Sequence, residues 1–160
     1  MREQVQQFLD YITEEKGYSN NTLAAYRNDL SQFTSYLEPR VSRWEQVTRD
    51  IIMDYIMAMK SDQEYASSTV ARKVAAIKSF FHYLVDRGVL QDDPTATLDS
   101  PKVRKRLPKA ISDEDLERLL AEPAKEQTPK ALRDRALLEV LYATGLRVTE
   151  LVSLNVDDVN

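Results

Sequence analysis

An arginine held between two helix boundaries is the residue of this sequence best placed to do chemistry. Arg147 follows Gly145, a residue typical of helix ends, and precedes a segment that can begin a new helix. A guanidinium fixed at such a corner can donate two hydrogen bonds at once to the oxygens of a phosphate. Glu150, three residues later, can orient the guanidinium or simply balance its charge. Arginine near a helix end also binds free backbone carbonyls, so the spacing alone leaves both interpretations open.

Other kinds of catalytic site find little support in the residue types present. The sequence has no cysteine and a single histidine, His82, which excludes thiolate nucleophiles and disulfides and disfavours a metal site or a Ser-His-acid triad. No glycine-rich phosphate loop occurs, and the eight tyrosines mostly fall at helix core spacings. The sequence also lacks a long apolar run and an apolar N-terminal signal core. Together these features predict a cytoplasmic protein without a cofactor.

The charge distribution is compatible with an anionic partner even though the chain is acidic overall. The net charge is −4 over 160 residues, yet residues 101–109 contain several basic side chains and no acid. A second acid-free window, 65–85, contains Arg72, Lys73 and Lys78. Because exposed charges more than about 10 Å apart are largely screened, a phosphate backbone responds to this local field rather than to the total. Both windows are also compatible with ordinary solvated faces, and the charge pattern alone leaves this alternative open.

The elements that must position these residues are helices. In residues 1–92, apolar side chains recur every three or four positions in four successive segments. The boundary residues expected for them are Gly17, Ser19 or Asn20, Pro39, Thr48, Ser67 or Ser68, and Gly88. Four amphipathic helices with short links can cover one another's apolar stripes, so this region is predicted to form a compact helical bundle.

Residues 93–110 are predicted to form an extended basic linker, because Pro94, Pro101 and Pro108 each disfavour helix in the residue before them. Residues 111–160 are predicted to form three further helices, the first opened by Ser112 and the last capped by Thr149. The side chains expected to be buried there include Leu137, Leu138, Val140 and Leu141. These helices have little to pack against within this chain, so we expect partly exposed apolar faces.

The segment from Thr22 to Phe33 reads T-x-x-x-Y-x-x-D-L-x-x-F, with Thr22, Tyr26, Asp29, Leu30 and Phe33 at the fixed positions. This pattern resembles the N-terminal motif of the tyrosine recombinase (phage integrase) family. Residues 68–84 and 93–109 resemble the fourth helix and interdomain linker of the family. Residues 133–138 and 143–151, the latter reading ATGLRVTEL, resemble the box that supplies its first catalytic arginine. The resemblance covers essentially the whole chain and is nearest to the Xer branch, whose members resolve chromosome dimers.

The resemblance implies a fold and a mechanism. It implies an all-α chain: a four-helix core-binding (SAM-like) bundle over 1–92, a linker over 93–110, and the first helices of an incomplete catalytic domain over 111–160. In this family a tyrosine attacks a DNA phosphodiester and forms a 3′-phosphotyrosyl link without metal or nucleotide. Arg147 would be the first catalytic arginine, whereas the remaining catalytic groups find no match up to Asn160. By itself the 160-residue chain is therefore expected not to cleave DNA.

The resemblance also implies binding to double-stranded DNA, together with other recombinase protomers in a tetrameric synapse and without a membrane. The expected DNA contacts lie in the fourth helix and the linker, with weaker candidates on the second and fourth helices. These residues are Arg72, Lys73, Lys78, Lys102, Arg104, Lys105, Arg106, Arg27 and Ser68. Two alternatives stay open: a stand-alone, non-catalytic helical DNA-binding module, and a helical protein-interaction domain.

Overall fold

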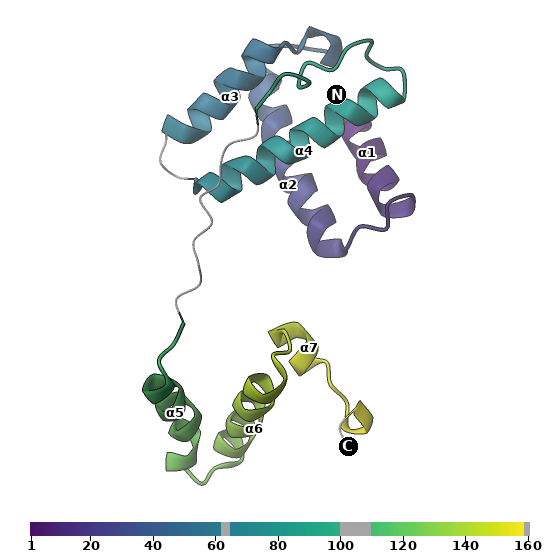
Figure 1. Cartoon of the computed structure of the whole chain (residues 1–160). Coiled ribbons are helices and arrows are strands. Elements are labelled where there is room, and N and C mark those ends of the chain that lie inside the picture. Colours follow the sequence, from purple (N-terminus) through teal and green to yellow (C-terminus); the bar gives the residue numbers. More distant parts are fainter. Residues whose placement is uncertain (62–64, 100–109, 159–160) are drawn as a thin grey trace. The chain divides into compact units, whose positions relative to one another are not determined.

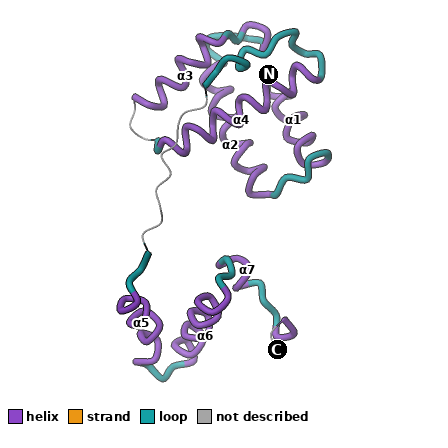
Figure 2. Tube along the Cα trace, viewed as in Figure 1, coloured by secondary structure: helices purple, strands orange, loops and turns teal. Residues whose placement is uncertain are grey.

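The computed structural model describes residues 1–61, 65–99 and 110–158, and within these ranges every regular element is helical (Figures 1 and 2). The predicted all-α class is therefore confirmed. The chain divides into two compact units, residues 1–105 and 106–160. In the described parts of the chain, no helix combines the length and the apolar character that crossing a membrane requires.

The first unit is built around one central helix. Its elements are α1 (Arg2–Glu14), α2 (Asn20–Leu37), η1 (Trp44–Gln46), α3 (Arg49–Ser61) and α4 (Ser67–Asp86). Helix α4 packs against α1, α2 and α3, and α1 packs against α2. Figure 1 shows α4 crossing α2 and α1. The apolar stripes of the four helices thus meet in one core, as expected of an amphipathic bundle.

Local capping chemistry sets most of the helix boundaries at the predicted places. The Ser19 hydroxyl accepts a hydrogen bond from the backbone N–H of Thr22 at 3.3 Å, and Thr48 Oγ1 accepts one from the N–H of Ile51 at 3.4 Å. Helix α4 is an exception, because its N-cap is Ala66 rather than Ser67 or Ser68. Alanine has no side-chain acceptor, so the first turn of α4 lacks the predicted cap.

An aromatic cluster fills the centre of the first unit. The Phe33 ring of α2 lies 5.1 Å from the Tyr55 ring and 6.3 Å from the Phe81 ring, centroid to centroid. The Trp44 ring lies 4.7 Å from that of Phe80. All of these side chains are buried. Rings from α2, η1, α3 and α4 therefore meet in one cluster, which fixes how α2 and α4 cross.

The segment after α4 folds back onto the bundle. Thr95 and Leu98 are buried, with 0% and 3% of their surface exposed. The Asp93 carboxylate accepts a hydrogen bond from the Thr95 N–H at 2.7 Å, and Lys78 Nζ donates to the Leu98 carbonyl at 2.9 Å. The predicted linker begins at residue 93, but these bonds make residues 93–98 part of the first unit's packing.

The second unit is a short series of helices with a small core. Its elements are α5 (Asp113–Ala121), η2 (Glu122–Lys125), α6 (Pro129–Thr144), α7 (Val148–Val152) and η3 (Val156–Asp158). Among residues 110–158, Ala131 and Leu151 are the only buried side chains. Six large apolar side chains are exposed on its helices, namely Leu119, Leu132, Tyr142, Val148, Val152 and Val156.

The predicted core positions of α6 are only partly covered. Leu137, Leu138, Val140 and Leu141 were expected to be buried, but each is of intermediate exposure. The helices of this unit supply too few apolar neighbours to enclose them. The expectation of partly exposed apolar faces over 111–160 is thereby confirmed.

Candidate functional site

Arg147 occupies the sharp turn between α6 and α7. Helix α6 ends at Gly145, whose φ of 66° lies in the left-handed region that glycine adopts without steric cost. Two residues later, Arg147 is the N-cap residue of α7 and has an extended backbone. The glycine stop and the new helix start therefore place the arginine at an interhelical corner, as predicted.

Glu150 holds Arg147 from the first turn of α7. Its carboxylate accepts the backbone N–H of Arg147 at 2.8 Å and the Nη1–H of the Arg147 guanidinium, also at 2.8 Å. The predicted capping role of Thr149 is wrong, because Arg147 is the N-cap and Glu150 satisfies its N–H. Within the described residues, the guanidinium donates to no backbone carbonyl. Of the interpretations that the spacing leaves open, the structure therefore supports an oriented guanidinium.

The Arg147 side chain is also accessible. Its exposed fraction is 83%, compared with 44% for Glu150. A guanidinium has five N–H donors, and Glu150 engages one of them. The corner thus presents a charged group that is tethered on one side and open to an incoming anion on the other.

A second charged cluster lies in the first unit, where α2 crosses α4. Asp29 of α2 is buried and forms ion pairs with both Arg72 and Lys73 of α4. Lys73 Nζ lies 3.2 Å from Asp29 Oδ1 and donates a hydrogen bond to Gln32 Oε1 at 2.6 Å. The Lys73 side chain is 2% exposed, whereas that of Arg72 is 44% exposed. Two neighbouring basic residues therefore occupy different environments.

The residues predicted to contact DNA lie in different environments, and only some of them are accessible. Lys73 does not fit the prediction, because its buried ammonium is already paired inside the bundle. Arg72 and Ser68 are exposed four residues apart on one face of α4, whereas the Lys78 ammonium is bonded to the Leu98 carbonyl. Arg27 is exposed and lines a pocket formed by residues of α1 and α2, and Arg72 is not among the residues of that lining. The remaining candidates lie outside the described residues: Lys102, Arg104, Lys105 and Arg106.

Comparison with known families accounts for both units. The model described as "Phage integrase, N-terminal SAM-like domain" matches residues 5–88, which contain α2, α3, α4 and most of α1. The model described as "Phage integrase family" matches residues 109–160, which contain the Arg147 corner. The chain belongs to the phage integrase family.

Relatives within the phage integrase family are similar along the whole chain. "Tyrosine recombinase XerC" of Roseiflexus castenholzii is 49% identical over 100% of this chain and 51% of its own length. The XerC protein of Herpetosiphon aurantiacus is 48% identical over 100% of this chain and 52% of its own. "Tyrosine recombinase XerD" of Pseudomonas aeruginosa is 44% identical over 98% of this chain and 52% of its own. The chain thus spans about half the length of the relatives it matches.

Asp29 and Gln32 are polar residues of the first unit whose partners the sequence pattern did not reveal. Asp29 belongs to the family's N-terminal motif and stands beside Leu30 in the apolar stripe of α2. A carboxylate at a core position must be paired, because an isolated buried charge is costly. The position of Asp29 in the apolar stripe therefore indicates that it has a buried partner. It does not identify Arg72 and Lys73 as the partners.

Tyr55 is a buried packing residue of the first unit. Burial raises the pKa of Tyr55 to about 12, with smaller contributions from Tyr65 and Asp29. A phenol with a raised pKa is a poor nucleophile at neutral pH. The core-packing interpretation therefore holds for Tyr55.

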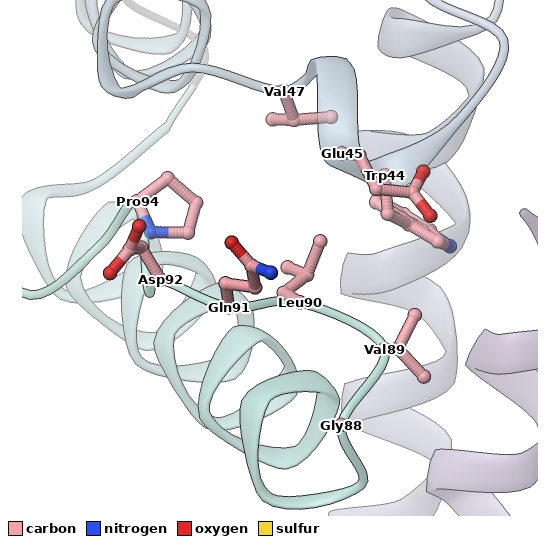
Figure 3. Close-up of a pocket in the computed structure, with 9 residues that line it drawn as sticks. All are labelled: Trp44, Glu45, Val47, Gly88, Val89, Leu90, Gln91, Asp92 and Pro94. Atoms are coloured by element: carbon pink, nitrogen blue, oxygen red, sulfur yellow. The ribbon is translucent and has the colours of Figure 1, made fainter.

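A pocket of about 550 Å³ lies between the η1 region and the segment after α4 (Figure 3). Its lining includes the carboxylates of Glu45 and Asp92 together with apolar side chains such as Trp44 and Leu90, and among the described residues no basic side chain contributes to it. Such a lining repels phosphate. Of the predicted DNA-contacting residues that the structure describes, none lines this pocket, so we expect DNA to bind elsewhere on the first unit.

The Glu150 bond to Arg147 is expected to be lost on acidification. The backbone N–H and then the guanidinium of Arg147 lower the pKa of Glu150 below its ordinary value of 4.5. A lowered pKa means that the bond is fully formed above pH 4.5 and is lost as the pH falls through the lower, folded-state value. Following the Arg147 amide resonance by NMR should show this titration, and Glu150→Gln should abolish it. A titration midpoint at or above 4.5 would contradict the observed geometry.

Proposed function

We propose that residues 1–160 form the N-terminal, DNA-binding half of a site-specific tyrosine recombinase, which exchanges strands through a 3′-phosphotyrosyl intermediate. The observation that best supports this proposal is the exposed Arg147 guanidinium, tethered to Glu150 within the segment matched by the phage integrase family. The specific role proposed is chromosome-dimer resolution in the cytoplasm, which is the role of the Xer branch that the sequence resembles.

In this proposal Arg147 acts on the scissile phosphate. A tyrosine hydroxyl gives up its proton as its oxygen bonds to phosphorus. The bond between phosphorus and the 5′ oxygen of the next nucleotide breaks, that oxygen takes up a proton, and the phosphate stays on the tyrosine. Negative charge gathers on the non-bridging oxygens during this exchange. A guanidinium already oriented by Glu150 can donate hydrogen bonds to them without further reorganisation. No tyrosine among residues 1–160 is assigned as the nucleophile.

The exposed face of α4 supports DNA binding by the first unit. Ser68, Arg72, Ala75 and Ser79 follow one another at helical spacing, and all are exposed. Their side chains include no acid, and three of the four are small, so a DNA backbone can approach the helix closely. Arg72 supplies the positive charge on this face. Double-stranded DNA is therefore the proposed ligand, bound together with further recombinase protomers in a tetramer.

The proposed linker contacts predict a change in the salt dependence of DNA binding. These contacts can be tested with a linker variant that carries four substitutions: Lys102→Gln, Arg104→Gln, Lys105→Gln and Arg106→Gln. Each phosphate contact that is lost should lower the slope of log K against log [salt] by about 0.9, because fewer counterions are released. Fluorescence anisotropy with a labelled duplex at several salt concentrations measures both the affinity and the slope.

A variant with the same net charge provides the control for this experiment. Lys16→Gln, Arg40→Gln, Arg43→Gln and Lys60→Gln remove four positive charges outside the proposed contact set. The control should bind with nearly the wild-type slope, because the local field matters more than the total. If the linker variant keeps both the wild-type affinity and the wild-type slope, the linker contacts are refuted.

A further inference from the structure

The cluster at the α2–α4 crossing contains one buried carboxylate and two cations. Asp29 is 1% exposed and faces Arg72 and Lys73 from across the helix pair. Lys73 is held from several sides: Asp29 Oδ1 at 3.2 Å, Gln32 Oε1 at 2.6 Å and the Tyr65 ring, whose centroid lies 5.2 Å from Nζ. The Tyr65 hydroxyl also approaches Gln32 Oε1, at 3.5 Å. Lys73 is thus locked in the interior.

The charges of this cluster do not cancel. Asp29 carries one negative charge, which the buried Lys73 can neutralise by itself. Arg72 is the additional cation, and its guanidinium is the exposed member of the group. Without Lys73, the buried Asp29 carboxylate would be paired with Arg72 alone, because an unpaired buried charge is strongly unfavourable. The identity of residue 73 therefore decides how much positive charge Arg72 presents at the surface.

We propose that Lys73 is a positioning residue: by neutralising Asp29 from within the bundle, it leaves Arg72 tethered but still positively charged toward a DNA phosphate. This inference rests on the proposed DNA-binding function. It assigns Lys73 a role without DNA contact, whereas Arg72 makes the contact. The two residues are adjacent in sequence but about 100° apart around the helix, so one points inward and the other outward.

The salt dependence of duplex binding tests this division of roles. Arg72→Gln should lower the slope of log K against log [salt] by about 0.9, the effect of one lost phosphate contact. Lys73→Met should lower the slope by the same amount, because Asp29 then neutralises Arg72. The double variant Asp29→Asn with Lys73→Met should regain the wild-type slope, since Arg72 is again an uncompensated cation. Adding Arg72→Gln to this double variant should lower the slope once more.

The slopes of the single and double variants distinguish the proposed role of Lys73 from two alternatives. If Lys73 itself contacted phosphate, removal of Asp29 would not restore the slope. If Lys73 served only to stabilise the fold, the folded single variants would keep the wild-type slope. Lys73→Gln provides a second single variant whose side chain can still hydrogen-bond to Gln32, and it should behave like Lys73→Met. Circular dichroism and cooperative thermal unfolding establish which variants are folded.

Each outcome has a defined meaning. A folded Lys73→Gln or Lys73→Met variant with the wild-type slope, or a folded double variant without rescue, overturns the role of Lys73 but leaves DNA binding intact. If both single variants fail to fold, the double variant and its Arg72→Gln derivative still decide the matter, since equal slopes in these two overturn the proposal. Absence of duplex binding by the wild-type chain at low salt refutes the proposed function itself.

Discussion

Replacing Arg147 by alanine is expected to lower the rate of DNA cleavage by about 10²–10³-fold, the loss typical for removal of one donor that stabilises transition-state charge. The effect should appear in the cleavage rate rather than in DNA affinity, because this guanidinium is proposed to act on the charge that develops at phosphorus. The measurement requires a complete catalytic domain. A suitable protein joins residues 1–160 to the remaining half of the Roseiflexus castenholzii relative, which the chain matches over 51% of its length.

The cleavage rate is measured as formation of a covalent protein–DNA adduct on a nicked substrate that traps the intermediate. Arg147→Lys is the matched variant, because lysine keeps the positive charge but lacks the planar fork of donors. It should recover only part of the lost rate. Residues 1–160 alone should form no adduct. An Arg147→Ala hybrid that cleaves at the rate of the unsubstituted hybrid would remove the main support for the recombinase proposal.

Replacing Phe33 by alanine is expected to cost about 3–5 kcal/mol of the free energy of unfolding of the first unit. Phe33 is fully buried, and its ring joins α2 to Trp44, Tyr55 and Phe81. The loss combines the missing apolar burial with the cavity that rigid neighbouring rings cannot fill. Since domains are stable by only about 5–15 kcal/mol, a large part of the stability should disappear. Urea denaturation followed by circular dichroism measures the change.

Met57→Ala is the control for this stability prediction. Met57 lies on α3 and is 60% exposed, so its truncation should change the free energy of unfolding by less than about 0.5 kcal/mol. A Phe33→Ala variant that loses less than about 1 kcal/mol would show that the aromatic cluster does not carry the bundle's stability.

Features that depend on near neighbours in sequence could be predicted well. The Ser19 and Thr48 caps each bond to a backbone N–H three residues ahead, and Gly145 ends α6 where a left-handed residue is needed. The pairing of Arg147 with Glu150 spans the same short separation. One turn of helix brings such residues together whatever the rest of the chain does. Thr149 is not the cap of α7, because the Glu150 carboxylate accepts the Arg147 N–H instead.

Features that depend on the packing of distant segments could not be predicted. The residues next to Lys73 in the sequence do not indicate that its side chain points inward. It does so because it pairs with Asp29, which lies 44 positions away. The return of residues 93–98 to the bundle likewise depends on a bond between Lys78 and Leu98, 20 positions apart. Proline content indicated an extended linker there, but the burial of Thr95 and Leu98 outweighed that preference.

The sequence by itself determined the helices, most of their caps, the family motifs and the Arg147 corner, because each of these is encoded by residues within one or two helical turns. Only the tertiary structure decided which basic side chain is buried and which remains available to DNA. That choice depends on which cation a buried carboxylate meets when two helices cross, and helix crossing is settled by core packing rather than by local spacing.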